Sequence, residues 1–508
     1  MRREGLALLA AGCLLLAGCK GEKAPDVSQA PSPTPSSAAV EETPAPQEVR
    51  SFVLPLDPAG GWNPYTGSKS GNMALAPLVY ESLFELDGSF AYHPLLAREA
   101  GASEDGLRWT VVLREGVSFS NGESLTAQAA AQAVNAARGE KSAYAARLAG
   151  VKKVTAQDQN TLVFELSAPN ARFLALLDFP IALVAQDGVY GTGPYVAQED
   201  KLTARAGWWW GLSLPLTEIS LLEIKDADAL AAAFSADQLS LAAADPTGSD
   251  TLAYAGNYQS WEYPTSNMLY LGFQCAKGPC KSAEFRQAVS RAVDREELAG
   301  QTLLGHATAA ALPAPALSGL YDETAAGELT LDLEAAAKAL DELGYTLGEE
   351  GTRQNGRKSL SLTLLVNADN AFKEAMARSI SEDLGQLGIE VKVQALAWEE
   401  YKKALERGSF DLYLAECRLT GDLDPSPFLT WGSGLYYGGF QSAELSQALA
   451  QARLTGQWAD SYRLWAQQAP LAVLCFKNAQ LLTQWGQVEG ADPTQGNLFY
   501  HFEGWHIG

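Results

Sequence analysis

The sequence predicts an α/β protein, mainly because of one β-α-β pattern. Leucines alternate along 360–364, apolar residues then recur at helical spacing over 372–387, and alternation returns at 389–393 after Gly388. Such a unit implies parallel strands in a sheet that helices cover. The chain is also long enough for two or three packed domains, with 508 residues of which 47% are hydrophobic.

An earlier stretch supports the same class. Residues 109–113 alternate with period two, the turn sequence SNGE follows at 120–123, and Thr126 is placed to cap a helix. Two further alternating runs, 151–154 and 161–166, flank the turn sequence QDQN and predict a hairpin.

Two later helices have clear start signals. Ser282 and Asp332 stand where N-caps are expected, and Gly344 ends the second helix. No period of 20 to 50 residues repeats along the chain, so a solenoid is not expected.

The charge balance bears on possible partners. The formal net charge is −23, and the sequence has no basic runs and no basic patches interleaved with aromatic residues. A field of this sign repels phosphate backbones, so nucleic acid is not an expected partner.

The N-terminus predicts export. Two arginines precede the apolar run at 5–18, which is short for a membrane span but has the length of a signal-peptide core. The run ends in LAGC, which resembles the lipobox of bacterial lipoproteins, so we expect a signal peptide at 1–18 and lipid on Cys19. A plain secretory leader and lipidation of Cys13 are the alternatives. No later stretch of the sequence is long and apolar enough to span a membrane.

Residues 19–49 are expected to form a tether. They are rich in Pro, Ser, Ala and Glu and have no period that would bury a face. A flexible chain of about thirty residues spans roughly 30 Å, which would let the folded part stand off the membrane.

Four cysteines remain in the folded region. Cys275 and Cys280 enclose the turn-forming sequence AKGP, and in an exported protein this spacing predicts a local disulfide. Zinc binding by the pair would lack further ligands. Cys417 and Cys475 lie in apolar runs, which favours buried free thiols, with a mutual bridge as the alternative.

The sequence offers little for catalysis or metal binding. It contains four histidines and no HExxH, GxSxG, P-loop or EF-hand motif. His501 and His506 are the nearest approach to a metal pair, and their position favours surface residues. We therefore expect neither an enzyme nor a resident metal or cofactor.

Two other motifs leave alternatives open. Asp422 and Asp424 would suit paired acid/base carboxylates, but the sequence DLDPSP is first of all a turn. The run Trp208–Trp210 would suit stacking on a ligand, although core and rim packing is commoner for such runs.

Six stretches together resemble the solute-binding proteins of ABC importers, in the large family that includes dipeptide- and oligopeptide-binding proteins. They occur in family order, and the second is the most specific because its strand, turn and capped helix must agree in length. The six are LVYESLF at 78–84, LRWTVVLREGVSFSNGESLTAQ at 107–128, GTGPY at 191–195, AEFRQAVSRAVDREEL at 283–298, LDELGY at 340–345 and GSFDLYLA at 408–415.

The resemblance implies a two-lobed periplasmic-binding-protein-like clamp (type II, large peptide-binding subclass) with an extra subdomain in the first lobe. The first lobe would use 50–265, with the inserted subdomain at about 84–185. The second lobe would use 266–479, and residues 480–508 would return to the first lobe. The ligand would be enclosed between the lobes.

The resemblance also implies site residues. Asp422 matches a carboxylate that pairs with the terminal ammonium of a peptide in peptide-binding members. Ser68, Lys69 and Ser70 match a first-lobe loop that hydrogen-bonds an extended peptide, and Trp398 matches an aromatic residue of a side-chain pocket.

The sequence departs from the family pattern near this site. CRLTG at 417–421 replaces a Gly-Trp pair that is common in the family. Some peptide binders use an arginine for the far carboxylate of the peptide, but no such arginine is evident upstream, where Glu416 stands. Lys69 or Arg418 would be the substitute, or the ligand lacks a carboxylate.

The function that the resemblance implies is capture of a solute, first of all a peptide, and its delivery to ABC permease subunits. The protein would be a monomer, held by lipid on the extracytoplasmic face of the cell membrane. Two alternatives stay open: the same fold binding a non-peptide cationic solute, and a receptor that signals to a membrane partner without transport. A secreted hydrolase is disfavoured because no nucleophile-base motif is present.

Overall fold

The computed structural model describes residues 51–66, 70–249, 254–430, 433–435 and 437–508. These residues belong to one unit, Val49–Gly508. The predicted leader and tether, with the lipid site Cys19, lie outside the described residues, as do Ser68 and Lys69.

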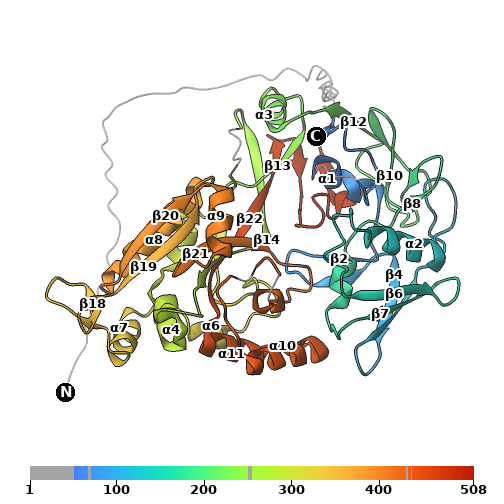
Figure 1. Ribbon diagram of the computed structural model, residues 1–508. Helices are drawn as coiled ribbons and strands as arrows, with labels where there is room; N and C mark the ends of the chain where they lie inside the picture. The colour runs from blue at the N-terminus through green and yellow to red at the C-terminus, as the bar shows by residue number, and fades with distance from the viewer. Residues whose placement is uncertain (1–50, 67–69, 250–253, 431–432, 436) are drawn as a thin grey trace, which may run out of the picture. The chain divides into compact units, whose positions relative to one another are not determined.

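A mixed seven-stranded sheet is the largest in the described part of the chain (Figure 1). Its order is β13-β22-β14-β21-β19-β20, and β15 also pairs with β22. The bounds are β13 Leu241–Ala244, β22 Leu471–Gln484, β14 Tyr258–Phe273, β21 Leu412–Arg418, β19 Ser361–Asn367, β20 Glu390–Leu396 and β15 Ala307–Ala309.

The predicted β-α-β unit is confirmed within this sheet. Strands β19 and β20 pair in parallel, and α8 (Ala371–Gln386) connects them. Asn370 caps α8, accepting a hydrogen bond from the Lys373 backbone N–H at 2.9 Å. Gly388 follows the helix at φ +76°, and a Cβ there would lie 2.6 Å from the Gly351 carbonyl oxygen, so the turn requires glycine.

A second sheet of four strands belongs to the expected first lobe. Its order is β1-β12-β11-β10, in which β1 and β12 are parallel and the other pairs antiparallel. The bounds are β1 Val53–Leu56, β12 Glu218–Glu223, β11 Lys201–Ala204 and β10 Tyr195–Ala197. Because β1 and β12 are far apart in sequence, the sheet brackets the segment predicted to be inserted.

That inserted segment has its own antiparallel sheet, in the order β4-β5-β7-β6. The strands are β4 Ala97–Ala102, β5 Arg108–Leu113, β7 Thr161–Leu166 and β6 Val151–Ala156. The predicted strand, turn and helix are confirmed, since β5 leads to α2 (Ala127–Ala137), whose N-cap Thr126 accepts from Ala129 at 3.2 Å. The predicted hairpin is β6-β7.

The remaining elements are shorter or lie outside these sheets. The other α-helices are α1 Ser70–Val79, α3 Ala227–Ser235, α4 Ala283–Ala292, α5 Arg295–Glu297, α6 Glu323–Gly327, α7 Leu333–Glu342, α9 Trp398–Glu406, α10 Ala443–Thr455 and α11 Ala459–Gln468. The short strands are β2 Phe84–Leu86, β3 Tyr92–Pro94, β8 Leu183–Val184, β9 Val189–Tyr190, β16 Thr346–Leu347, β17 Arg353–Asn355, β18 Lys358–Ser359, β23 Val488–Glu489 and β24 His506–Ile507. The predicted caps Ser282 and Asp332 are confirmed, accepting from Phe285 at 3.2 Å and from Ala335 at 2.8 Å.

Strand β14 shows how the sequence sets the two faces of the large sheet. Met268 and Tyr270 join one buried cluster, while Leu269, Leu271 and Phe273 join another. Alternate side chains of a strand point to opposite faces, so a continuous apolar run predicts burial on both sides.

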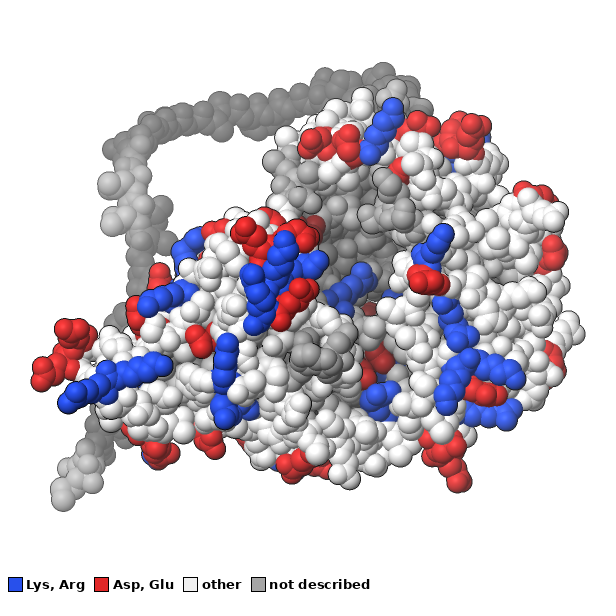
Figure 2. Space-filling view, in the orientation of Figure 1, with Lys and Arg blue, Asp and Glu red and all other residues white. Residues whose placement is uncertain are grey.

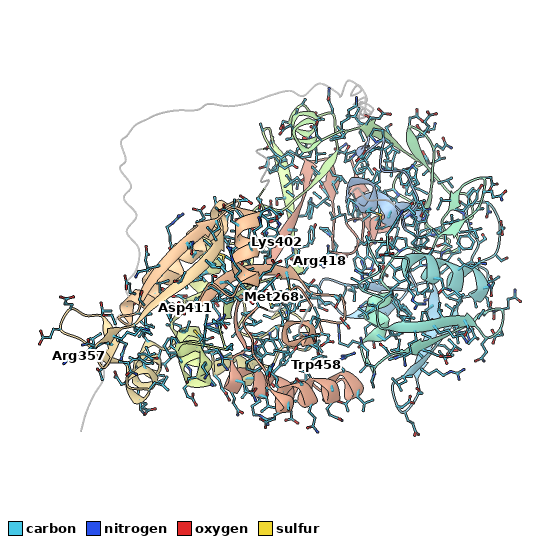
Figure 3. The ribbon with its side chains drawn as sticks, viewed as in Figure 1. Met268, Arg357, Lys402, Asp411, Arg418 and Trp458 are labelled. Atoms are coloured by element: carbon cyan, nitrogen blue, oxygen red, sulfur yellow. The ribbon has the colours of Figure 1, made fainter. Side chains whose placement is uncertain are left out.

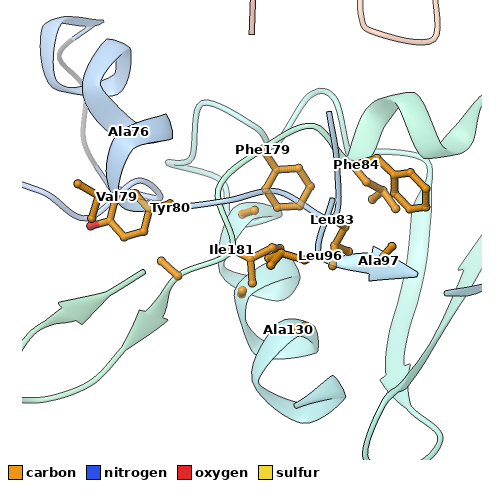
Figure 4. Close-up of a cluster of buried hydrophobic side chains, with 14 of the residues drawn as sticks. Ala76, Val79, Tyr80, Leu83, Phe84, Leu96, Ala97, Ala130, Phe179 and Ile181 are labelled. Atoms are coloured by element: carbon orange, nitrogen blue, oxygen red, sulfur yellow. The ribbon is translucent and has the colours of Figure 1, made fainter. Parts of the chain in front are cut away.

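The core of the first lobe is a separate cluster. In it, Ala130 of α2 lies with Leu83, Leu96 and Ile181, close to Phe179 (Figure 4). The small side chain at Ala130 lets the helix approach these larger residues, so α2 is fixed on the inserted segment.

The predicted lobe boundaries fall inside two long strands. Position 265/266 lies within β14 and 479/480 within β22, and these strands pair with each other over most of their length. Their register shifts between Pro264 and Met268. The boundaries stay a prediction, because each strand continues past its boundary position.

The predicted Cys275–Cys280 bridge is not formed, and this expectation is corrected. Both residues are free thiols, as are Cys417 and Cys475. The Cys275 Sγ lies 3.6 Å from the Phe273 carbonyl oxygen, and the Cys280 Sγ lies 3.7 Å from that of Asp411. Each thiol therefore has its own backbone acceptor, and Cys280 is buried in the core.

Within the described residues, the helices are all too short or too polar to cross a bilayer.

Candidate functional site

A cavity of about 1120 Å³ lies among segments that are distant in sequence. It is slightly larger than the roughly 300–1,000 Å³ usual for small-molecule sites in proteins. Five stretches supply most of its wall: the helix α1 and the residues after it, the segments 141–147 and 178–180, the end of β21 at 418–420, and 495–503. Figure 2 shows basic and acidic side chains together in the hollow of the face of the molecule that it displays.

Two arginines border this cavity. Arg147 lies on the segment after α2, and Arg418 is the last residue of β21, labelled in Figure 3. The Arg147 guanidinium donates to the Asp178 backbone carbonyl and lies 5.8 Å from the Tyr144 ring centre. Arg418 donates through Nη2 to the Gln495 carbonyl oxygen at 3.4 Å.

The two guanidiniums are close enough to influence each other. Arg418 is an exposed residue, but partial desolvation of its guanidinium and, after it, the charge of Arg147 lower its pKa. Among the described residues, no carboxylate oxygen lies within the 4.0 Å that defines an ion pair with either guanidinium. Neither arginine thus forms a direct ion pair with a described residue, although the Asp178 carboxyl acts electrostatically on both.

Carboxyl groups border the same cavity. Burial raises the pKa of Asp178 to about 6, and the nearby charges of Arg147 and Arg418 oppose that rise. Burial also raises the pKa of Glu85 to about 7, assisted by repulsion from Asp178, Glu503 and Glu81. Glu81, Glu85, Asp178 and Glu503 are called the acid group below; all four line the cavity.

The tryptophan run holds one member of the acid group. Trp208 donates its indole N–H to Glu81 Oε1 at 3.1 Å, and Trp209 donates to Glu81 Oε2 at 2.7 Å. Trp208 and Trp210 stack with ring centres 5.8 Å apart, and both border the cavity. Burial raises the pKa of Glu81 to about 7, although both indole hydrogen bonds oppose the rise. The run therefore forms part of the cavity wall and positions a carboxyl group.

Asp422 does not line this cavity. Its side chain is buried, and it accepts hydrogen bonds from Thr420 Oγ1 at 2.5 Å and from Asn170 Nδ2 at 2.7 Å. Asp424 makes the predicted turn, accepting from the backbone N–H and the hydroxyl of Ser426. These two carboxylates therefore hold loops in this structure.

Of the other predicted ligand residues whose side chains the structure describes, Arg418 borders the cavity and Trp398 does not. Trp398 begins α9, is 50% exposed, and stacks on Tyr401 with ring centres 6.0 Å apart. Ser70 begins α1, and Ser68 and Lys69 lie outside the described residues.

A chain of ion pairs lies beside the cavity. Buried Lys477 pairs with Asp245 at 2.6 Å and with Glu416 at 3.3 Å, and Lys373 pairs with Glu416 at 2.8 Å. Asp245 borders the cavity, but its charge is matched by Lys477. These carboxylates are therefore less suited to a ligand cation than the acid group is.

Sequence reasoning missed Arg147, Glu81 and the role of the tryptophan run. Glu81 lies inside the LVYESLF stretch, which carries part of the family resemblance but gives no indication of the role of Glu81. No metal centre emerges from the described residues, since none of their His, Cys, Asp and Glu side chains form a group of three suited to an ion. His501 borders the cavity, but His506 does not.

Comparison with known proteins gives a consistent result. The family model described as "Bacterial extracellular solute-binding proteins, family 5 Middle" matches residues 91–438. The chain is 28% identical to the nickel-binding periplasmic protein of Escherichia coli (strain K12) over 378 residues, covering 69% of this chain and 71% of that one. It is 26% identical to the glutathione-binding protein GsiB of the same strain over 441 residues, covering 79% and 83%.

A solved structure shows the fold. The periplasmic murein tripeptide binding protein MppA, in its unliganded open form, aligns with a TM-score of 0.75 at 20% identity, covering 91% of this chain and 98% of that one. The expected α/β clamp is thus confirmed as the fold class.

Proposed function

Because the chain belongs to the bacterial extracellular solute-binding proteins of family 5, which bind peptides or related solutes for ABC importers, we propose that it captures short peptides and delivers them to a membrane permease. One observation carries the choice of cargo. A single cavity of about 1120 Å³ contains two arginines without ion-pair partners among the described residues, together with the acid group.

A zwitterion fits this combination of charges. A free peptide carries an ammonium group and a carboxylate, and each needs an oppositely charged partner when it leaves water. The aromatic rings of Tyr144, Phe179 and Trp210 line the same cavity and offer apolar surface for side chains. The names of relatives that bind glutathione and a murein tripeptide are in keeping with this cargo.

The acid group takes the role that the resemblance assigns to Asp422. In this structure the Asp422 carboxylate is held by Asn170 and Thr420, whereas Glu85 and Glu503 border the cavity. We therefore assign the ligand ammonium to the acid group and treat Asp422 as a residue that ties two loops together.

A non-peptide cationic solute is the second candidate. It is favoured by one observation, namely that among the described residues that line the cavity the four carboxyl groups of the acid group outnumber the two arginines and Lys141. Such a solute would be bound by the acid group alone, without a contribution from the arginines. Nickel has weaker support, because the described residues form no cluster of three potential metal ligands.

The proposal includes an anchor at Cys19. The sequence LAGC ends the apolar leader and a Pro- and Ser-rich segment follows, which together favour a lipid-anchored protein on the extracytoplasmic face of the cell membrane.

Mass spectrometry of the natural cargo tests the proposed function. The protein is purified from its own cells without added ligand, denatured, and the released small molecules are identified. Peptides with free amino and carboxyl ends are the expected result. Release of cations that lack a carboxylate would favour the second candidate, and a metal complex would contradict both.

A further inference from the structure

We infer that Phe90 is a positioning residue for the cavity: it joins the inserted segment to the loop after β21 and thereby fixes how two walls of the cavity stand to each other. Phe90 lies at the turn between β2 and β3, which pair as a hairpin, and its side chain does not line the cavity itself. The inference rests on the proposed function only in that the cavity binds a solute, and it holds for any solute that fits.

The first reason is the cluster in which Phe90 is buried. Phe90 is 4% exposed, and every other described residue of its apolar cluster lies between Met268 and Phe476, in the expected second lobe. Met268 and Trp458, labelled in Figure 3, belong to this cluster. Phe84, which begins β2 of the same hairpin, belongs instead to the core of the first lobe. One side chain of the inserted segment therefore enters the apolar core of the other half of the molecule.

The second reason is the backbone on the two sides of this contact. Phe90 has φ +62°, and Leu423 in the loop after β21, fully buried in the same cluster, has φ +55°. Bulky residues rarely adopt such values, which persist where the surrounding structure holds them. At the hairpin the Asp87 carboxylate does this, accepting from the backbone N–H groups of Ser89 at 2.8 Å and Ala91 at 3.0 Å. The turn thus directs the ring into the cluster although the backbone is strained.

The third reason is a direct tie between the two sides. Arg172, also in the inserted segment, donates through Nη2 to the carbonyl oxygens of Phe90 at 2.8 Å and of Gly421 at 3.4 Å. Phe90 also lines, with Leu419 and Gly421, a residual space of about 20 Å³, which has room for about one water molecule. The two sides are therefore closely packed. Phe90, Arg172, Gly421 and Leu423 are called the joint below.

The joint lies next to the walls of the cavity. Asp178 of the inserted segment and Arg418 at the end of β21 line the small residual space, and both also border the large cavity. The joint thus fastens the wall formed by 141–147 and 178–180 to the wall formed by 418–420. A site whose walls are fixed before the ligand arrives binds more tightly, because less ordering accompanies binding. Loss of the Phe90 ring should therefore weaken binding without removing a ligand contact.

Hydrogen exchange of the ligand-free protein tests the joint directly. The Ala171 N–H donates to the Arg453 carbonyl oxygen of α10 at 2.6 Å, so its exchange reports separation of the inserted segment from the other half of the molecule. Phe90→Gly removes the ring and relieves the backbone strain. It should speed exchange at Ala171 by about tenfold or more, the effect of losing a typical buried contact. Exchange at Ala130 inside α2 should stay native, because the inserted segment remains folded.

Two further variants separate the role of the ring from loosening of the turn. Ser89 is exposed on the same turn, and Ser89→Gly loosens the backbone while leaving the ring in place, so exchange at Ala171 should stay native. Phe90→Leu keeps an apolar side chain and should restore most of the native exchange rate. Native exchange at Ala171 in Phe90→Gly, or equal acceleration in Ser89→Gly, would overturn the inference.

Calorimetric titration with a library of tripeptides that have free ends tests the effect on binding. Phe90→Gly should bind these peptides about tenfold more weakly than the native protein, because the walls must then be ordered when the ligand binds. Ser89→Gly and Phe90→Leu should stay close to the native affinity. Native affinity in Phe90→Gly would overturn the positioning role even if exchange at Ala171 is faster.

The result also separates this inference from the proposed function. If no tripeptide binds the native protein, the peptide proposal fails, and the titration is repeated with the mixture of small molecules released from cell-derived protein. Faster exchange at Ala171 together with weaker binding of that mixture by Phe90→Gly upholds the joint. Native behaviour of Phe90→Gly in either measurement overturns it.

Discussion

The side chain of Asn170 donates a hydrogen bond of 2.7 Å to the carboxylate of Asp422, which lies 252 positions further along the chain. The bond ties the inserted segment to the loop after β21. Arg172 strengthens the tie by donating to the Gly421 carbonyl oxygen at 3.4 Å, and it also donates to the Phe90 carbonyl oxygen within the inserted segment at 2.8 Å. Gly421 packs so closely that a Cβ there would lie 2.4 Å from the Ala175 carbonyl oxygen. The loop is therefore fastened by several contacts.

The first prediction concerns this tie. Asp422→Ala should lower the free energy of unfolding of the ligand-free protein by about 1–3 kcal/mol, because the partly buried Asn170 amide would lose its acceptor. Urea unfolding measures the change, with Asp460→Ala, at a largely exposed position, as the control. Asp422→Asn should weaken the binding of free and of N-acetylated peptides by the same factor. Weaker binding of the free peptides alone would instead make Asp422 the acceptor of the ligand ammonium.

The second prediction concerns pH and Glu81. Burial raises the pKa of this carboxyl from its usual 4.5 to about 7, so the folded state binds a proton more tightly than the unfolded state does. The free energy of unfolding should therefore fall as the pH rises from about 4.5 to about 7. Glu81 contributes at most about 3 kcal/mol to this change.

A variant isolates that contribution. Glu81→Gln cannot titrate and should flatten the pH dependence of unfolding, whereas Glu99→Gln, at an exposed pair with Arg98, should leave it unchanged. Urea unfolding at pH 5 and pH 8 gives the comparison. A native protein that gains stability between these values, or a Glu81→Gln variant with the native slope, would contradict the assignment.

The third prediction concerns the thiols. The structure has free thiols at Cys275, Cys280, Cys417 and Cys475. Thiol counting on mature protein under denaturing, non-reducing conditions should give four. A count of two would mean that one pair is bridged, and a count of zero that both are.

The fourth prediction concerns the anchor. Cys19→Ser should release the protein into the medium or stop its processing, because the proposed lipid acceptor is gone. Cell fractionation measures this, and Cys13→Ser is the matched control because it changes the other leader cysteine. Unchanged membrane retention of Cys19→Ser would exclude lipid on Cys19.

Local signals explain what the sequence predicted well. Thr126, Ser282 and Asp332 cap helices through backbone groups three residues away, and the alternation in 360–364 reports burial of one strand. Such patterns depend on neighbours in the chain, so they are readable without knowing the fold. The lobe boundaries were less accessible, because β14 and β22 both continue past them, and the register shift between Pro264 and Met268 is visible only when the two strands are paired.

The site depends on contacts between distant residues, which explains why sequence analysis found only part of it. Arg147 and Arg418 both border one cavity although 270 residues separate them, and no local motif marks either residue as part of a site. Glu81 is distinguished by its tryptophan partners more than a hundred positions away. Asp422 was selected from its place in a loop, but its hydrogen bond to Asn170 is visible only in three dimensions.

The central claim is that the cavity holds a peptide whose ammonium group lies at the acid group. A crystal structure of the protein with the cargo released from its own cells, added back at saturating concentration, measures this most directly. We predict that a peptide fills the cavity, with its ammonium facing Glu85 or Glu503. A ligand bound elsewhere, or one whose ammonium contacts Asp422, would contradict the claim.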